Sequence, residues 1–320
     1  ARFKASLNER GENMKKPNIA VLGATGVVGQ EILKILVESD FPYNSIKFLA
    51  SARSAGKQIE FKGQMHTIEE AKPEAFDGLN IVLASAGGAT SKAFAPEIVK
   101  RGAVLVDNSS AFRMDEDVPL VIAGVNDDDL KKHKGIVANP NCSTSQLMLP
   151  LKPLHEYGNI KRMIVSTYQA VSGAGKDGID DLIDGTKAFY DGTSYENRKF
   201  TTHPIVFNLI PQIDVFVEND YTKEEMKVVN ETRKILHLSD DVKISCTAVR
   251  VPVHTSHSEA VSIEFEREIT PEKAREILSN AYGVEVMDDP ASAKYPTPVY
   301  AAGKDPVYVG RIRKDLALDN

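Results

Sequence analysis

A glycine-rich turn near the beginning of the chain places the strongest constraint on its fold. Residues 23–29 read Gly-Ala-Thr-Gly-Val-Val-Gly, after an apolar strand predicted over Ile19–Leu22 and before a helix predicted over Val27–Val37. Glycines at such a junction allow a tight turn and bring amide N–H groups against a pyrophosphate at the positive end of the helix. The spacing is GxxGxxG rather than the GxGxxG of many NAD enzymes, so alone it could mark only a tight turn. At the first strand-to-helix junction it predicts a dinucleotide site that includes Gly23, Gly26 and Gly29.

The alternation of short strands with amphipathic helices continues toward residue 141 and is typical of a parallel sheet. The further elements predicted here are strands over Ile46–Leu49, Asn80–Ala84, Val104–Val106 and Val118–Val125, and a helix over Thr90–Arg101. We therefore expect an α/β chain that begins with a Rossmann-type dinucleotide-binding domain over residues 14–141. Residues 1–13 are polar and lack clear periodicity, and we expect them to be a non-native or disordered extension upstream of Met14.

The pattern changes after Cys142, where the predicted strands no longer alternate regularly with helices. Strands are predicted over Ile160–Ala170, Val242–Val251, Ala260–Glu266 and Val307–Arg311, and helices over Gly178–Tyr190, Tyr221–Leu238 and Pro271–Ser279. Thr270 is the predicted N-cap of the last helix, with Pro271 at its first position. This part predicts a second, α+β domain over residues 142–320, built on a mostly antiparallel sheet.

Composition excludes several classes of function. The chain has 320 residues, more than one core usually needs, which agrees with two domains. A formal net charge of −6 gives no basis for binding nucleic acid or an anionic membrane, and no apolar run approaches the roughly 20 residues that span a bilayer. Two cysteines argue against a disulfide framework and suit a reducing, cytoplasmic compartment.

The sequence offers no pattern of metal ligands. Six histidines stand apart from other histidines, cysteines and carboxylates at ligand spacing, namely His66, His133, His155, His203, His237 and His254. We interpret them as structural or solvent-facing, with room for an indirect role near the site only for His203 and His254. We predict no metal site.

The loop after the second strand predicts which dinucleotide is bound. An NAD site usually has an acidic residue there to accept from the ribose 2′-OH. Residues 49–57 instead read Leu-Ala-Ser-Ala-Arg-Ser-Ala-Gly-Lys, without a carboxylate. Arg53, Ser54 and Lys57 suit a 2′-phosphate, so the loop favours NADP over NAD, although it could also be only a solvated basic loop.

Cys142 is the candidate nucleophile. It stands in Ala138-Asn139-Pro140-Asn141-Cys142-Ser143-Thr144, before a helical run over Gln146–Leu154 for which Ser143 or Thr144 could be the N-cap. The dipole at a helix N-terminus favours the thiolate, which is the form that attacks carbonyl carbon. Asn141 puts a polar amide beside the sulfur. A lone cysteine is most often an inert core residue, so the interpretation depends on the residues that accompany it.

Arg250 and His257 are the candidate partners of this thiol. They lie seven residues apart on either side of a predicted turn. An imidazole can take the thiol proton and return a proton to the substrate, and a guanidinium can bind a carboxylate through two hydrogen bonds. Ser109-Ser110-Ala111-Phe112-Arg113 follows the strand over Val104–Val106, where open α/β sheets place ligand contacts.

With these residues in place, the chain resembles the aspartate-β-semialdehyde dehydrogenase family. The similarity runs from about Asn18 to the C-terminus, and it rests on seven motifs in order: GATGVVG, ASARSAGK, NSSAFRM, ANPNCSTSQ, STYQAVSGAG, the EEMK within residues 222–228, and RVPVHTSHS. The combination of PNCST with a downstream RVPV-x-x-SH is highly specific. A more distant family with the same chemistry, N-acetyl-glutamyl-phosphate reductase, typically has a Pro-Gly-Cys turn, whereas this chain has Pro-Asn-Cys.

The resemblance implies roles for individual residues. Cys142 is expected to form the acyl-enzyme, His257 to be the acid/base, and Gln169 to orient the substrate near the thioester. The substrate contacts implied are Arg250 for the α-carboxylate, Glu224 for the ammonium group, and Arg113 and Lys227 for the phosphate, with Asn141 beside the sulfur. The cofactor contacts implied are Thr25, Gly26, Val27, Val28, Arg53, Ser54, Ser172 and Gly173.

The resemblance also implies a reaction, the NADPH-dependent reductive dephosphorylation of L-4-aspartyl phosphate to L-aspartate 4-semialdehyde in lysine, threonine and methionine biosynthesis. It implies a cytoplasmic homodimer, or a dimer of dimers. The family usually ends with a further helical segment that supplies a cofactor contact, whereas the printed sequence stops at Asn320; we expect cofactor affinity and the stability of the first domain to depend on that segment. The alternatives are a related acyl-phosphate reductase and a non-catalytic NADP-binding homologue.

Overall fold

The computed structural model describes residues 15–196, 199–200 and 203–320, so the extension expected over residues 1–13 lies outside the described residues. Contacts between Cα atoms divide the chain into two compact units. Unit 1 comprises the described residues up to Val121 together with Asp128–Pro140, and unit 2 comprises Ile122–Asp127 and Asn141–Asn320.

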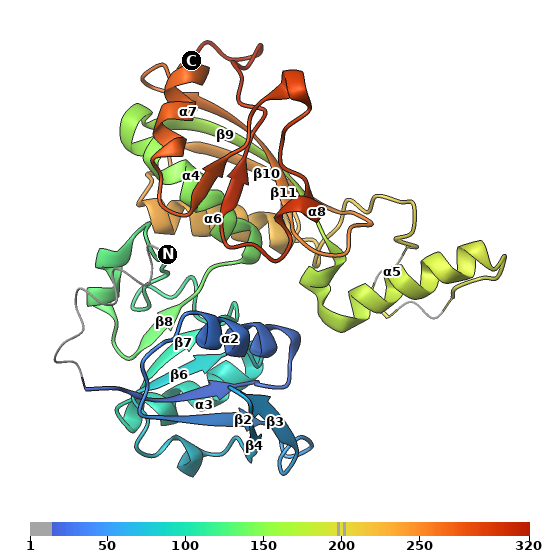
Figure 1. Ribbon diagram of the computed structural model, residues 1–320. Coiled ribbons are helices and arrows are strands. Elements are labelled where there is room, and N and C mark those ends of the chain that lie inside the picture. The colour runs from blue at the N-terminus through green and yellow to red at the C-terminus, as the bar shows by residue number, and fades with distance from the viewer. Residues whose placement is uncertain (1–14, 197–198, 201–202) are drawn as a thin grey trace. The chain divides into compact units, whose positions relative to one another are not determined.

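Unit 1 is built on a six-stranded sheet (Figure 1). Its strands, in the order in which they lie side by side, are β5 (Glu69–Glu70), β2 (Ser45–Ala50), β1 (Asn18–Leu22), β6 (Ile81–Ala84), β7 (Val104–Asp107) and β8 (Ile136–Ala138). All neighbouring strands are parallel. The chain order runs in opposite directions on the two sides of β1, and open α/β sheets bind ligands at such a switch point. The predicted Rossmann-type architecture is confirmed.

Two helices cover opposite faces of this sheet. Ile19 and Val21 of β1 pack in the cluster that includes α2 (Val27–Glu38), whereas Ala20 and Leu22 pack in the cluster that includes α3 (Gly88–Lys100). Successive residues of a strand point to opposite faces, so β1 is apolar throughout, as is typical of a parallel strand covered on both sides. The elements not predicted from the sequence are β5, β8 and the antiparallel hairpin of β3 (Gln58–Phe61) and β4 (Gln64–Thr67).

The prediction of a strand over Val118–Val125 is wrong. Only Leu120 forms a bridge there, with Ala138, and residues 123–125 form a turn. Pro119 has no N–H to give to a ladder, and Gly124 has a φ of +80°, outside the extended region. The apolar run is buried without being a strand.

Unit 2 is built on a three-stranded sheet in the order β10 (Lys243–Arg250), β9 (Ile160–Gln169) and β11 (Ser258–Phe265). We predicted a mostly antiparallel sheet, and the structure corrects this to a mixed one. β9 pairs antiparallel with β11 but parallel with β10. The long connection from β9 to β10 carries two helices, and such a crossover returns the chain in the same direction. The two short strands β12 (Val284–Val286) and β13 (Val307–Val309) also pair in parallel.

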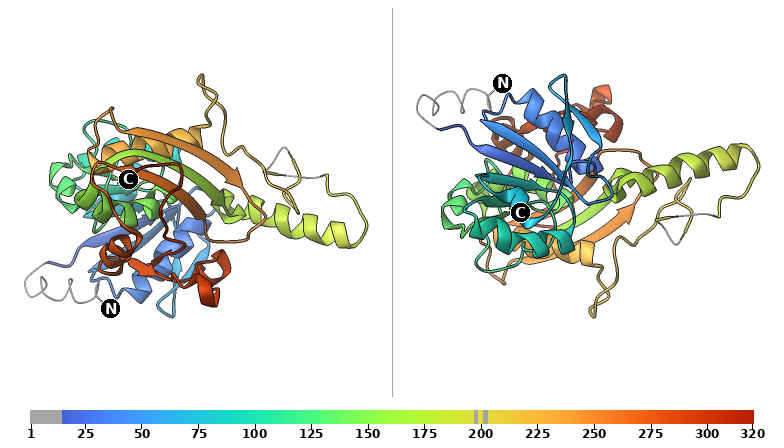
Figure 2. Two further views of the ribbon diagram at one scale, coloured as in Figure 1. Left: turned by 90° about the horizontal axis from the view of Figure 1, so that it is seen from above. Right: turned by 90° about the horizontal axis from the view of Figure 1, so that it is seen from below.

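Among the residues that the structure describes, the α-helices of this unit are α4 (Cys142–Gly158), α5 (Gly175–Tyr190), α6 (Lys223–Leu236), α7 (Pro271–Ser279) and the single turn α8 (Pro298–Ala301). α4 and α6 pack against each other and against the sheet, whereas α5 projects away from the sheet in the views of Figures 1 and 2. α7 begins as predicted, because Thr270 accepts the N–H of Lys273 and Pro271 takes the first helical position. α6 begins with a capping box formed by Thr222 and Glu225.

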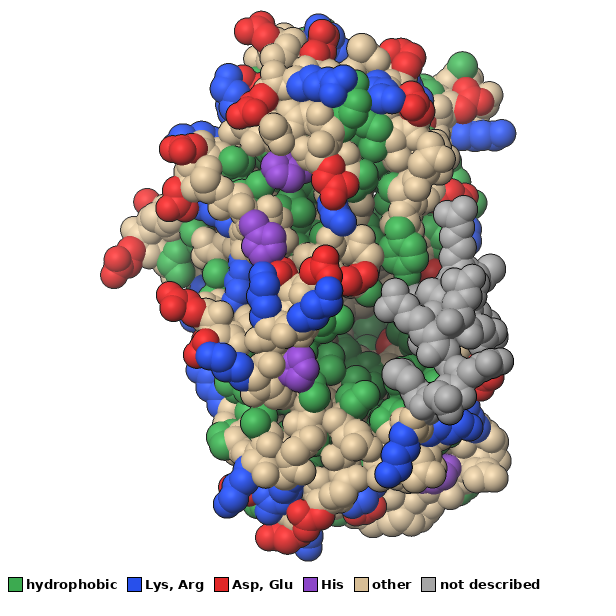
Figure 3. Space-filling model, turned by 90° about the vertical axis from the view of Figure 1, so that its left-hand side faces the viewer, with side chains coloured by type: hydrophobic (Ala, Val, Ile, Leu, Met, Phe, Trp, Pro, Cys, Tyr) green, Lys and Arg blue, Asp and Glu red, His purple; other side chains and the backbone are tan. Residues whose placement is uncertain are grey.

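The surface carries charges of both signs. On the face shown in Figure 3, acidic and basic side chains are interspersed, as expected for a chain whose charges nearly balance. Among the described residues, no helix combines the length and the apolar character that crossing a membrane requires.

Candidate active site

Cys142 is the first residue of α4, with an exposed side chain. The N-cap is Asn141, which corrects the expectation of Ser143 or Thr144: its Oδ1 accepts the N–H of Ser143 at 2.9 Å and that of Thr144 at 3.4 Å. The helix therefore starts earlier than expected, and the sulfur lies at the positive end of its dipole, which favours the thiolate. Cys246 contrasts with it, because burial raises the pKa of that thiol to about 12.

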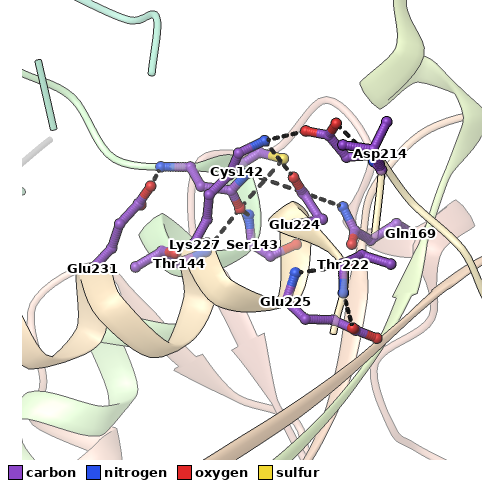
Figure 4. A network of polar contacts seen from close by, with 12 residues as sticks. Cys142, Ser143, Thr144, Gln169, Asp214, Thr222, Glu224, Glu225, Lys227 and Glu231 are labelled. Atoms are coloured by element: carbon purple, nitrogen blue, oxygen red, sulfur yellow. Dashed lines mark hydrogen bonds and ion pairs between the residues drawn. The ribbon is translucent and has the colours of Figure 1, made fainter. Parts of the chain in front are cut away.

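α6 holds the turn that precedes the nucleophile (Figure 4). Asn141 Nδ2 donates to Glu224 Oε1 at 2.9 Å, and the backbone N–H of Asn141 donates to Glu231 Oε2 at 2.7 Å. Both carboxylates are buried, with 5% and 1% of the residue exposed. Since they come from one helix, the position of Cys142 depends on how α6 packs on α4.

Glu224 connects the nucleophile turn to the end of β9. Its Oε1 also accepts from Gln169 Nε2 at 3.0 Å, and its Oε2 accepts from Lys227 Nζ at 3.0 Å. Burial opposes ionisation of Glu224, but the charge of Lys227 and the donors of Gln169 and Asn141 outweigh it, so its pKa is lowered. The carboxylate is therefore ionised at neutral pH.

Lys227 lies between two carboxylates. It donates to Asp214 Oδ2 at 3.1 Å in addition to Glu224. Burial lowers its pKa, but the two acids outweigh burial, so the net pKa is raised and the ammonium stays charged. Any anion that Lys227 binds must compete with these two partners.

Arg250, the last residue of β10, is 3% exposed. One guanidinium nitrogen, NH1, donates to the carbonyl of Ala170 at 2.7 Å, and the ring of Phe200 lies 5.3 Å from its guanidinium carbon. Its Nε is buried without a hydrogen-bond partner among the described residues. Burial lowers the pKa of Arg250, while the charges of Glu224 and Cys142 act in the opposite direction. A buried donor of this kind fits a carboxylate ligand.

The same residue, Ala170, also orients His257. Its backbone N–H donates to His257 Nδ1 at 2.9 Å, so the proton of the neutral imidazole is assigned to Nε2. Burial lowers the pKa of His257 to about 4, and the positive charge of Arg250 adds to this effect. The imidazole is thus neutral near pH 7 and presents a hydrogen-bond donor. The preceding residue, Ser256, has a φ of +78°, which marks a constrained turn.

Gly173 lies against both of these side chains. A Cβ placed on it would come within 3.0 Å of His257 Nε2 and Cε1 and 3.1 Å of Arg250 NH1. Gly173 and Ser172 belong to the 3₁₀ turn Val171–Ala174. A hydrogen bond from the N–H of Ser172 to the carbonyl of His254 holds this turn in place. The structure therefore brings together, within unit 2, Cys142, His257, Gln169, Arg250, Glu224, Lys227, Asn141, Ser172 and Gly173.

The remaining predicted residues lie in unit 1. The turn at residues 23–29 fits a dinucleotide, because the first turn of α2 has no side-chain cap and its N–H groups stay available. Gly23 has a φ of +87°, and a Cβ on Gly29 would lie 2.2 Å from the carbonyl oxygen of Gly23. Thr25, Val27 and Val28 are exposed beside this turn.

The loop after β2 lies next to the glycine turn, since the carbonyl of Leu49 accepts the N–H groups of Gly23 and Ala24. Arg53 is exposed on this loop and Ser54 is half-buried. Arg113, 7% exposed, donates through Nε to the carbonyl of Asn139 and through NH2 to that of Asn108. Arg113 thus belongs to unit 1, whereas Lys227 belongs to unit 2.

Three neighbours of the site were not anticipated from the sequence: Asp214, Glu231 and Phe200. Asp214 and Phe200 stand in irregular segments, where no periodicity identifies them. The sequence did contain a signal for Glu231, because this carboxylate stands in α6 among residues that are buried, namely Val228, Thr232 and Ile235.

Comparisons with known proteins agree with this geometry. A family model described as the semialdehyde dehydrogenase NAD binding domain matches residues 18–133, and one described as the semialdehyde dehydrogenase dimerisation domain matches residues 151–320. The aspartate-semialdehyde dehydrogenase of Aquifex aeolicus is 52% identical over 304 residues, which cover 94% of this chain and 89% of the relative. That of Bacillus subtilis is 49% identical, over 95% of this chain and 89% of the relative.

The chain belongs to the aspartate-semialdehyde dehydrogenase family. Members of the family catalyse the NADPH-dependent reduction of aspartyl phosphate, so the predicted family, enzyme class and cofactor are confirmed. A solved Vibrio cholerae aspartate semialdehyde dehydrogenase II, in complex with ASA, matches with a TM-score of 0.91 and 42% identity, covering 95% of this chain and 90% of that one. The Candida albicans aspartate semialdehyde dehydrogenase, with NADP, matches with a TM-score of 0.74 and 26% identity over 95% and 91% of the two chains.

Proposed function

We propose that this chain converts L-4-aspartyl phosphate to L-aspartate 4-semialdehyde through a thioester on Cys142. The observation that supports the proposal is the position of Cys142, exposed at the N-terminus of α4 in the unit that also contains Arg250, Gln169 and His257. The product serves the biosynthesis of lysine, threonine and methionine. A free carboxylate is a poor acceptor of hydride, which is why an acyl-enzyme is formed first.

The chemistry begins with the thiolate. Cys142 Sγ attacks the acyl carbon of aspartyl phosphate, the bond from that carbon to the phosphate oxygen breaks, and phosphate leaves. The backbone N–H of Cys142, at the start of α4, stabilises the oxyanion. NADPH supplies the hydride that reduces the thioester carbon. The carbon–sulfur bond then breaks, which releases the aldehyde and returns the sulfur to its thiolate.

His257 acts in this scheme as a donor. Because Nδ1 accepts the N–H of Ala170 and the ring is neutral, His257 donates a hydrogen bond from Nε2–H to the reacting oxygen. The thiolate then owes its stability to the helix dipole and to the charge of Arg250, rather than to removal of the thiol proton by this imidazole in its present orientation.

Different charged side chains bind the different charged groups of the substrate. The buried guanidinium of Arg250 binds the α-carboxylate, and Glu224, ionised and 5% exposed, faces the ammonium group. Arg113 and Lys227 neutralise the phosphate, and Gln169 orients the acyl group. The glycine turn holds the pyrophosphate of NADP, with Thr25, Val27 and Val28 beside it, and Arg53 and Ser54 bind the 2′-phosphate. Ser172 and Gly173 are further proposed contacts of the cofactor.

We further propose the organisation of the whole protein. An NADP-binding domain runs over residues 14–141 and a catalytic and dimerisation domain over residues 142–320, in keeping with the two matched family models. The protein forms a homodimer or a dimer of dimers. It works in the cytoplasm, a reducing compartment that suits Cys142 and Cys246, which are not joined by a disulfide.

The reverse reaction tests the proposal. Purified protein, aspartate semialdehyde and NADP⁺ should produce NADPH only when phosphate is present, and Cys142→Ala should abolish this while NADPH still binds. Turnover in Cys142→Ala would exclude the thioester. Activity with the N-acetylglutamate semialdehyde and none with aspartate semialdehyde would instead favour the related reductase.

A further inference from the structure

Glu231 is an acid in an apolar setting. It lies in the third turn of α6 with 1% of its surface exposed, and Val228, Thr232 and Ile235 around it are equally buried. Burial of a carboxylate is unfavourable unless strong hydrogen bonds compensate for the lost hydration. The presence of an acid at this buried position therefore calls for a physical reason.

Its oxygen Oε2 accepts the backbone N–H of Asn141 at 2.7 Å, a short distance that is typical of a charge-assisted bond. Asn141 is the residue before the nucleophile. Its other polar groups are also engaged: Nδ2 with Glu224, Oδ1 with the N–H of Ser143, and its carbonyl with the N–H and hydroxyl of Ser145. The backbone N–H, the carbonyl and both side-chain polar atoms of Asn141 are therefore all hydrogen-bonded.

Two of these bonds come from the same helix. Glu224 and Glu231 are seven residues apart, about two helical turns, so they lie on one face of α6. Glu224 accepts a hydrogen bond from the side chain of Asn141, and Glu231 accepts one from its backbone. Together these bonds fix both the position and the rotation of the peptide that leads into Cys142. In Figure 4 the two carboxylates reach the turn before α4 from separate points along α6.

We propose that Glu231 is a positioning residue that sets the direction of the Cys142 thiol by holding the backbone N–H of Asn141. The inference rests on the proposed role of Cys142 as nucleophile. Glu231 acts through its acceptor oxygen. A shift of the turn moves the sulfur relative to the acyl carbon, and displacement by about 1 Å can cost on the order of 100-fold in rate.

Two conservative variants separate the acceptor from the charge. Glu231→Gln keeps an oxygen at the same reach and removes the charge, whereas Glu231→Asp keeps the charge and withdraws the oxygen by one methylene. We expect kcat of Glu231→Asp to fall about 10- to 100-fold with little change in KM, and kcat of Glu231→Gln to stay close to that of the wild type. The rate at which iodoacetamide alkylates Cys142 should fall in the aspartate variant and recover in the glutamine variant.

Asp288→Asn is the matched structural control. The Asp288 side chain is also buried, 1% exposed, and accepts the backbone N–H of Arg311 at 2.6 Å. Its other partners among the described residues are Arg275 and the N–H of Ile312, neither of which is a site residue. Asp288→Asn should lower the melting temperature of the protein without changing the rate at which Cys142 is alkylated. Wild-type kcat and alkylation in Glu231→Asp, or equal losses in both Glu231 variants, would overturn the proposal. If Glu231→Asp does not fold, a slowed alkylation in the folded Glu231→Gln overturns it, and an unchanged rate supports it.

Failure of this inference is distinct from failure of the proposed function. Alkylation of Cys142 is measured on the whole protein without substrate or cofactor, so it reports the position of the thiol whatever reaction the protein catalyses. If the wild-type protein shows no phosphate-dependent formation of NADPH, the proposed function fails, while the comparison of alkylation rates still decides the role of Glu231.

Discussion

At the scale of single residues, the two cysteines have opposite environments. Cys142 is exposed at a helix N-terminus, whereas Cys246 is buried in β10. Reactivity follows the thiolate fraction and access to solvent rather than the element itself. The same scale decides the state of His257, whose ring is oriented by a single backbone N–H.

We expect one fast and one slow thiol. At pH 7.5, iodoacetamide should modify Cys142 first, and Cys246, with its pKa raised to about 12 by burial, should react at least about 100-fold more slowly. Peptide mapping by mass spectrometry at several times gives both rates. Cys142→Ala is the control, because it should lose the fast phase and keep the slow one; two equally slow thiols would contradict the prediction.

The lowered pKa of His257 predicts that the free energy of unfolding falls in acid. Its pKa is about 4 in the folded protein, below the ordinary value of 6.5, because burial disfavours the charged ring. Between these two values the unfolded chain binds more protons, so its contribution to stability is complete above about pH 6.5 and is lost as the pH falls toward 4. Urea unfolding at pH 7, 6 and 5 should show a smaller decrease for His257→Asn than for the wild type. Parallel curves for the two proteins would exclude this linkage.

At the scale of elements, α6 carries more of the site than any other helix. Its first turn provides Glu224, its second provides Lys227 and its third provides Glu231. The helix begins where the hydroxyl of Thr222 accepts the N–H of Glu225 at 3.3 Å, while the Glu225 carboxylate accepts the N–H of Thr222. This capping box joins a local sequence signal to the position of the site, because fraying at this end would displace Glu224.

Thr222→Ala should therefore reduce both stability and rate. Loss of an N-cap hydroxyl costs about 1 kcal/mol of unfolding free energy, and kcat should fall as well, since Glu224 lies in the affected turn and Lys227 in the next one. Thr270→Ala is the matched control, because Thr270 caps α7, which carries no site residue. Denaturant unfolding and steady-state kinetics measure the two effects. A similar loss of kcat in both variants would mean that capping acts only through global stability.

At the scale of the whole molecule, the chain separates the two tasks of the reaction. The glycine turn and the loop proposed to bind the 2′-phosphate lie in unit 1, and the thiol of Cys142, the guanidinium of Arg250 and the imidazole of His257 lie in unit 2. Unit 1 contains two hydrophobic clusters, and unit 2 contains a cluster that includes Val171, Ile205 and Ile210. The sites of cofactor binding and of acyl transfer are thus tied to different cores.

NADPH should stabilise the protein against unfolding more than NADH does. At a free concentration of about 100 times its Kd, a ligand adds about 2.7 kcal/mol to the unfolding free energy of the part that binds it. Differential scanning calorimetry should show a larger upward shift with NADPH than with equal NADH. Arg53→Ala is the control and should reduce this difference, because the loop then loses its cation for the 2′-phosphate. Equal shifts with both nucleotides in the wild type would contradict the predicted preference.

The sequence by itself determined the local elements and the reactive groups. The glycine turn, the cap of α7 and the thiol after Pro-Asn depend on residues that are neighbours in the chain, so short-range patterns revealed them. The family motifs added roles for residues whose contacts no periodicity could indicate. Even so, local patterns misplaced the N-cap of α4 and the strand at Val118–Val125, where backbone geometry depends on partners elsewhere.

Tertiary structure alone decided how the groups meet. The bonds from Asn141 to Glu224 and Glu231 join residues 83 and 90 positions apart, and the parallel pairing of β9 with β10 brings Gln169 beside Arg250. It also decided that His257 presents Nε2–H, because a backbone N–H from Ala170, 87 positions away, occupies Nδ1. Such contacts form when buried polar groups must find partners after the core has packed, and that requirement is not written in any short stretch of sequence.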